Sequence, residues 1–136
     1  MSDENAKANS QAEPAYRHPD DFYIDYANNV YLEGSVWDMK LIFGQLDQSG
    51  TLAKVEQRGS VTLPWTQAKI LTYLLCLHLT GYEMANGKIH IPPAIMPPEP
   101  TQPTEEAQKN DPSVKAFFER MMWLREQFFG ANPPKA

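Results

Sequence analysis

A thiol beside a base would be the clearest sign of nucleophilic catalysis, and the nearest approach to one here is Cys76 with His78. Two residues apart on a helix, these side chains point about 160° from each other, so they cannot act as a pair. Free cysteine is commonly buried as a small hydrophobe, and we interpret Cys76 as a core thiol. The sequence holds one cysteine and therefore no internal disulfide. We expect a reducing, cytoplasmic setting.

The histidines and the paired acids do not predict a metal or acid-base centre. His18, His78 and His90 fall in a tail, a helix and a short predicted strand, without the spacing of metal ligands. The pairs Asp20-Asp21 and Glu105-Glu106 lie in segments that we expect to be disordered. General acid-base catalysis needs a fixed and partly desolvated geometry instead. We therefore predict no catalytic residue, no metal site and a chain that is not an enzyme.

Phosphate and nucleic-acid binding are also disfavoured. Gly44, Gly50 and Gly59 do not compose a glycine-rich loop that leads from a strand through a lysine into a helix. The formal net charge is -5 and the Lys and Arg residues are scattered, so the basic surface of a nucleic-acid-binding protein is missing. The densest apolar run, residues 70–79, has about half the length needed to cross a bilayer. We expect no cofactor, no nucleic-acid partner and no membrane span.

Residues 1–21 are predicted to form a disordered, acidic tail. This stretch has few large apolar residues, so it cannot bury enough surface to offset the entropy lost on ordering. It also lacks the basic start and apolar run of a secretory signal. The compact domain is therefore expected over residues 22–91.

Alternating apolar residues predict an antiparallel sheet at the start of this domain. Residues 22–32 alternate well enough to form a strand, with a bulge near Asn28-Asn29. The next strand is half-buried, because one of its faces collects Trp37, Met39, Leu41 and Phe43. Residues 33–35 supply a tight turn, so these two strands should form a hairpin. A third strand is predicted over about residues 52–63, with a bulge or break at Gly59 and one face made of Ala53, Val55, Val61 and Leu63.

A long helix is predicted from Pro64 to Ala85, closed by Asn86-Gly87, because the apolar period changes there from two to about three and a half. Its apolar stripe consists of Ala68, Leu71, Leu74, Leu75, Leu79 and Tyr82, widened by Ile70, Cys76 and Leu77. A helix that is apolar around most of its circumference is buried on more than one side. Either the C-terminal helix or a second copy of the protein should therefore cover it. Residues 88–91 are predicted to add a short strand.

Prolines punctuate residues 92–112 and favour an extended, semi-rigid linker. Beyond it we predict a helix over residues 113–130, with Asn110-Asp111 as candidate caps and Pro112 in the first turn, and a tail over residues 131–136. This helix carries our candidate partner-binding residues: Phe117, Phe118, Met121, Trp123, Leu124 and Phe128. Long linkers are unusual for a helix that only completes its local core. Docking on a partner or sister subunit and folding back within one subunit both stay open.

Together these elements predict an α+β protein. We expect an antiparallel sheet of three or four strands packed against one long helix, plus a separate C-terminal amphipathic helix after the Pro-rich linker. The expected core consists of Trp37, Phe43, Trp65, Leu71, Leu75 and Tyr82.

Three short motifs in this chain resemble a known family. They are Tyr26-Ala27-Asn28, a strand that ends in Phe43-Gly44, and the helix entry Pro64-Trp65, which is followed by Ala68-Lys69 and a leucine-rich helix. In their order and spacing over residues 25–89 they resemble the bacterial and archaeal family called domain of unknown function 3467. Pro64-Trp65 stands where that family more often has a Ser-Pro entry, which puts the usual side-chain cap of this helix in doubt. The resemblance implies a fold and no activity.

The hypothesis that best fits this sequence is a non-enzymatic module for protein binding or assembly. We expect a homo-oligomer, an accessory subunit of a larger complex docked through the C-terminal helix, or both. One alternative is a chaperone-like holder of apolar segments, which would keep apolar surface exposed in the free protein. Another is an enzyme whose site forms only between subunits.

Overall fold

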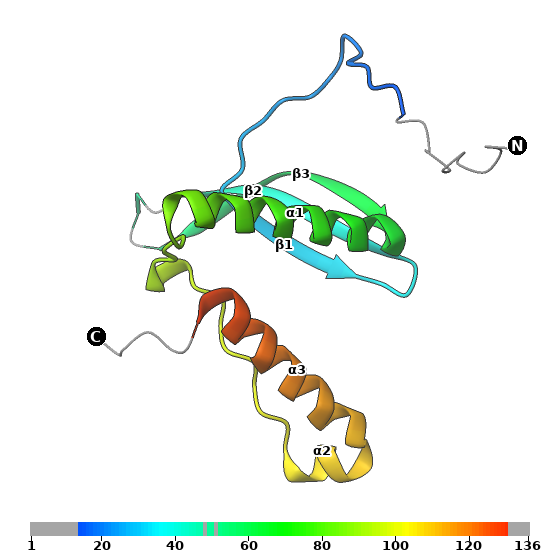
Figure 1. Cartoon of the computed structure of the whole chain (residues 1–136), viewed down its shortest axis with the longest axis vertical. Coiled ribbons are helices and arrows are strands. Elements are labelled where there is room, and N and C mark those ends of the chain that lie inside the picture. Colours follow the sequence, from blue (N-terminus) through cyan, green and yellow to red (C-terminus); the bar gives the residue numbers. More distant parts are fainter. Residues whose placement is uncertain (1–13, 48, 51, 131–136) are drawn as a thin grey trace, which may run out of the picture. The chain divides into compact units, whose positions relative to one another are not determined.

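The computed structural model describes residues 14–47, 49–50 and 52–130 (Figure 1). The predicted tails lie largely outside this range, because residues 1–13 and 131–136 are not described. By its internal contacts the chain divides into two units, Met1–Leu75 and Cys76–Ala136. Each unit is described by itself below.

The first unit contains a three-stranded antiparallel sheet in the order β1-β2-β3, which confirms the predicted hairpin and third strand (Figure 1). The strands are β1 (Asn29–Gly34), β2 (Asp38–Asp47) and β3 (Lys54–Pro64). Ser35 closes the β1–β2 turn: its Oγ accepts from the amides of Trp37 and Asp38, each at 3.1 Å. Trp37 therefore belongs to the turn and not to the strand face on which we placed it.

The predicted first strand starts too early, because residues 22–28 form no strand. One backbone hydrogen bond, from the Asn28 amide to the Gly44 carbonyl at 3.1 Å, and two side-chain hydrogen bonds hold this segment against β2. The Gln45 side-chain amide donates to the Tyr26 backbone carbonyl at 3.0 Å, and the Asn28 Oδ1 accepts from the Leu46 backbone amide at 2.6 Å. Alternating apolar residues gave no sign of these side-chain contacts, which span 18 and 19 positions of sequence.

A bulge lies in β3 next to Gly59, as the sequence predicts. Phe43 pairs with Gly59, whereas Gly44 pairs with Gln57, so one residue of β3 is left over between them. Because an extra residue inverts the alternation beyond it, Val55 pairs with Leu46 on one face while Val61 pairs with Leu41 on the other. The prediction that Val55 and Val61 share a face is wrong for this reason.

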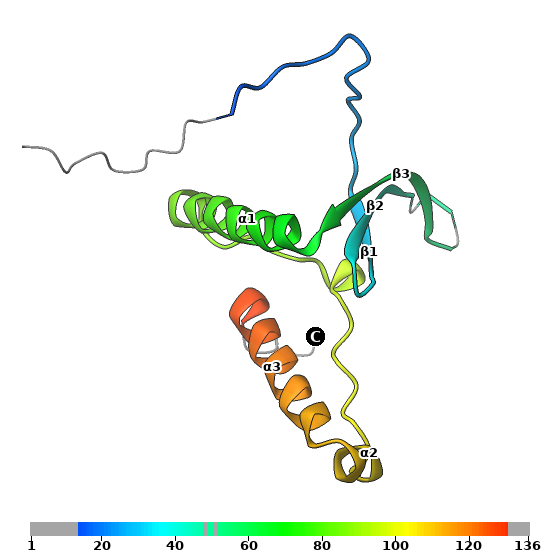
Figure 2. The ribbon, with the colours of Figure 1, turned by 90° about the vertical axis from the view of Figure 1, so that its right-hand side faces the viewer.

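Helix α1 (Trp65–Asn86) begins at the residue after β3, and Figure 2 shows the strand leading into the helix through a short connection. It ends at Gly87, whose φ of 84° is accessible to glycine and gives the predicted helix stop. Residues 88–91 form no strand, contrary to the prediction. The Ile89 amide donates to the Glu83 carboxylate at 2.8 Å instead of joining a sheet.

The second unit contains a short 3-10 turn, η1 (Pro93–Ile95), and two helices, α2 (Glu105–Asn110) and α3 (Pro112–Phe129). The predicted C-terminal helix is confirmed with its Asp111 cap, whose side chain accepts from the Ser113 amide. The sequence analysis missed α2 because prolines dominate the linker. Thr104, which caps α2 and precedes Glu105 and Glu106, is the signal that marks its start.

No apolar side chain is buried within the described ranges of this single chain. The predicted core is therefore wrong for one chain: Trp37 is 83% exposed and Leu75 is 54% exposed, and Trp65 and Tyr82 are also exposed. The physical reason is that a stable core lies between two well-packed layers of secondary structure. One three-stranded sheet and one helix leave these residues uncovered.

Candidate functional site

An apolar groove runs between the sheet and the first half of α1, within the first unit. Its volume is about 840 Å³. The strands provide Val30, Leu32, Met39, Leu41 and Phe43, and α1 provides Trp65, Ala68, Lys69, Leu71, Thr72 and Leu75. We call this surface the apolar groove, with a sheet floor and an α1 wall.

The strand register and the helix period explain why these residues line one groove. Side chains alternate across a strand, so Met39, Leu41 and Phe43 lie on the same face of β2. Leu32 and Val30 of β1 pair with Leu41 and Phe43 and extend that face. On α1 the wall residues recur at three- and four-residue intervals, which places them along one side of the helix.

Trp65 fixes one end of the groove. Its indole Nε1 donates to the Ser35 carbonyl at 2.9 Å. A Cβ on Gly34 would lie 3.5 Å from the Trp65 ring, an ordinary van der Waals distance, so the indole lies close to the backbone at the end of β1. The first turn of α1 is in this way attached to the β1–β2 turn.

The lining of the groove offers apolar contact and little chemistry. Its single ionisable side chain is Lys69, which is exposed. The Thr72 hydroxyl donates to the Ala68 carbonyl of its own helix at 2.8 Å, so it is already satisfied. Apart from Lys69 and Thr72, the lining residues are apolar. The groove suits the binding of another apolar surface.

The clearest polar cluster lies elsewhere in the first unit, around Asp25. The Asp25 carboxylate accepts from the Tyr23 hydroxyl at 2.8 Å, from the Tyr26 amide at 2.8 Å and from the Arg58 guanidinium at 2.9 Å. Hydrogen bonds from the Tyr23 hydroxyl, the Tyr26 backbone amide and the Arg58 guanidinium lower the pKa of Asp25, and the bond to Asp25 raises the pKa of Tyr23. Because these groups are solvent-accessible and satisfy one another, we interpret the cluster as a clamp that holds residues 23–28 at the β3 bulge.

The other residues that the sequence singled out for chemistry remain dispersed. Cys76 is a free, partly exposed thiol on α1. Among the described residues no group of histidine, cysteine or acidic side chains could hold a metal ion. In the same ranges no helix combines the length and the apolarity that crossing a membrane requires.

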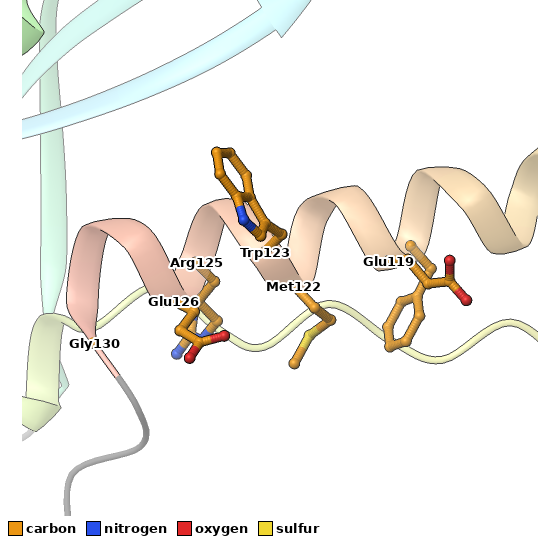
Figure 3. A pocket seen from close by; sticks show the side chains of 7 residues that line it. Glu119, Met122, Trp123, Arg125, Glu126 and Gly130 are labelled. Atoms are coloured by element: carbon orange, nitrogen blue, oxygen red, sulfur yellow. The ribbon is translucent and has the colours of Figure 1, made fainter.

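The six candidate docking residues all lie on α3 but on different sides of it. Helical spacing places Phe117, Met121, Leu124 and Phe128 along one stripe. Phe118 and Trp123 instead border a shallow groove of about 480 Å³ on another side, around Met122 and Glu126 (Figure 3). Four of the six side chains are exposed: Phe117, Trp123, Leu124 and Phe128.

Polar contacts tie α3 to its own unit. The Arg125 guanidinium donates to the Pro97 and Pro98 carbonyls at 2.7 and 3.3 Å. The Arg120 guanidinium lies 4.3 Å from the centre of the Trp123 ring, a distance typical of a cation–π contact. Part of the aromatic surface of α3 is therefore used within the chain, which the apolar spacing alone did not predict.

The motifs that carry the family resemblance have structural roles. The Asn28 side-chain oxygen accepts a hydrogen bond from the Leu46 backbone amide. A Cβ on Gly44 would lie 2.8 Å from the Glu56 carbonyl oxygen, so only glycine fits at this position of the paired strands β2 and β3. A comparison of the sequence with known protein families agrees with this resemblance: residues 1–91 match the family described as Protein of unknown function (DUF3467). The chain belongs to this family.

The DUF3467 match covers the sheet, α1 and the apolar groove, whereas α3 lies outside it. No curated protein and no solved structure matches the chain. The family description assigns no activity, so any function has to be argued from the surfaces themselves.

Proposed function

We propose that this DUF3467 protein is a non-enzymatic assembly module, which self-associates through the apolar groove and docks on a larger complex through α3. One observation carries the proposal. Within the described ranges, the single chain buries none of its apolar side chains, although the groove gathers them on one surface.

The energy at stake favours a partner for this surface. Full burial of a Val, Leu, Met or Phe side chain is worth about 1.5–3 kcal/mol. The groove lining contains several such residues, so covering them together removes a continuous apolar surface from water. Burying the groove under a protein surface is therefore more favourable in free energy than leaving it in contact with water.

Light scattering on the full chain tests the proposal. We expect a dimer or higher oligomer whose mass falls when Leu41→Glu places a carboxylate on the groove floor. Ile42→Glu is the matched control, because the neighbouring strand position faces the other side of the sheet. A wild-type chain that stays monomeric at all accessible concentrations would refute self-association. A chain that ends after Ile91 then separates the contribution of α3: if the oligomer persists, α3 is free to dock elsewhere.

A chaperone-like holder of apolar segments is the second candidate, and the open groove is the observation that favours it. Such a protein keeps the groove accessible in its native state. Binding of an apolar fluorescent dye to the native protein would support the holder, whereas an oligomer that covers the groove should bind little dye until it is unfolded.

A further inference from the structure

Helix α1 carries a second apolar surface on the side opposite the groove. Ile70, Tyr73, Leu74 and Leu77 lie there, and their exposed fractions are between 46% and 63%. Leu74 and Leu77 stand two residues from the wall residues Thr72 and Leu75, which on a helix is a rotation of about 200°. We call these four residues the outer stripe.

The helix is therefore apolar on two opposed sides. Over residues 65–82 its one charged residue is Lys69. A helix with this composition is stable in water only when both sides are covered. The sheet of the same chain can face only one side of α1. An arrangement that buries both sides must therefore fill the groove and also cover the outer stripe.

We propose that the groove is filled by helix α1 of a second copy of this chain, an inference that rests on the self-association proposed above. The outer stripe of each α1 packs on the sheet floor of the other copy. The two α1 walls face each other across a two-fold axis. The resulting layers are sheet, helix, helix and sheet, with the helix next to each sheet coming from the other chain.

Symmetry makes a second copy the economical occupant. In an isologous dimer the same patch serves on both subunits, so every contact occurs twice. Inserting α1 of the second copy fills both grooves and covers both outer stripes at once. Inserting α3 would fill a groove but leave the outer stripe of α1 in water.

The size and charge of the groove also fit α1. A helix about 10 Å across that rises 1.5 Å per residue would fill 840 Å³ with about seven residues. The outer stripe runs from Ile70 to Leu77 and has a similar length. No carboxylate lies on the stripe or the groove lining, and Lys69 can extend its amine toward water. Helix α3, by contrast, carries Arg120 and Arg125 in contacts of its own.

Crosslinking between copies tests this arrangement in the full-length protein. A Cys76→Ser chain supplies a background without native thiols. Two tagged versions of it, one with Leu41→Cys on the floor and one with Leu74→Cys on the outer stripe, are coexpressed and treated with a short bismaleimide. We expect a crosslinked heterodimer on denaturing gels. When Ile42→Cys replaces Leu41→Cys, the crosslinked fraction should fall at least severalfold, because that side chain faces away from the floor.

The other outcomes overturn the inference in distinguishable ways. If light scattering shows an oligomer but Leu41→Cys does not crosslink to Leu74→Cys, self-association holds and this arrangement is wrong. A crosslink from Leu41→Cys to Phe117→Cys in place of Leu74→Cys would make α3 the occupant. If a chain with both Leu41→Cys and the wall substitution Leu75→Cys crosslinks within itself in excess cysteine-free protein, α1 covers its own sheet. A monomeric chain removes the inference together with the proposed function.

Discussion

The two long helices differ in how polar residues are distributed around them. Helix α1 has one charged residue before Glu83 and is apolar on opposed sides, whereas α3 interleaves its aromatic residues with Lys115, Glu119, Arg120, Arg125 and Glu126. An all-round apolar helix requires permanent cover, whereas an amphipathic helix can bind on one side and remain soluble when free. We therefore expect α1 to form the obligate contact and α3 the exchangeable one.

Charging the outer stripe should produce the largest effect. Leu74→Glu removes a contact worth about 1.5–3 kcal/mol and places a carboxylate in an apolar interface. We expect the dissociation constant of the oligomer to rise by more than about tenfold, since about 1.4 kcal/mol corresponds to that factor. Sedimentation over a range of concentrations measures it. Thr80→Glu, on a side of α1 between the groove and the stripe, should leave the constant nearly unchanged; an equal effect of both would contradict a specific role for the stripe.

Substituting Gly44 should lower the folding stability of the sheet in the first unit. The Cβ of Gly44→Ala would lie 2.8 Å from the Glu56 carbonyl oxygen and 2.9 Å from the Val55 side chain. Such overpacking typically costs about 1–3 kcal/mol, which urea unfolding followed by circular dichroism would detect. Gly59→Ala is the matched control, because its Cβ would meet nothing within 4 Å. Equal loss from the two substitutions would show that steric crowding is not the cause.

Charging the α3 stripe should affect docking without affecting the sheet. The double variant Phe117→Asp and Met121→Asp should abolish α3-mediated association, because the carboxylates replace its apolar anchors. The sheet signal in circular dichroism should persist. Substituting the exposed Lys115 and Glu119 by alanine provides a control on the same helix. Collapse of the sheet signal in the double variant would show that α3 is part of the folded core.

The smallest effect is expected at the Asp25 clamp, through pH. Because the folded-state pKa of Asp25 is lowered from 3.8, its contribution to stability is present above that value and is lost as pH falls through the folded pKa. Asp25→Asn should lower stability slightly at neutral pH, where the contribution is present, and flatten the acid part of the stability profile, so that variant and wild type converge at low pH. Thermal unfolding at a series of acidic pH values measures the difference. An unchanged acid profile in the variant would mean that Asp25 does not stabilise the fold.

Local signals allowed much of the fold to be predicted. Asp111 caps α3, Gly87 ends α1 and Gly59 marks the bulge, and each acts within a few residues of its own position. The faces of β2 followed from alternation alone. These features were predictable because their causes are written in neighbouring residues.

Contacts between distant residues could not be read in this way. The clamp of residues 23–28 depends on Gln45, Leu46 and Arg58, and the face of Val55 depends on where β3 gains its extra residue. The sequence identified Phe43, Leu71 and Leu75 as apolar positions that need burial. It did not reveal that one chain leaves them along an open groove, because the distance between a helix and a sheet is set by packing and not by periodicity.

The junction between β3 and α1 has a consequence for how the chain closes. Pro64 ends the strand and Trp65 begins the helix, so there is no slack with which α1 could turn back over its own sheet. Short, strained hinges favour exchange of elements between chains, and longer ones permit closure within a chain. If the proposed pair forms, a few flexible residues inserted after Pro64 should let α1 close over its own sheet and convert the dimer into a monomer.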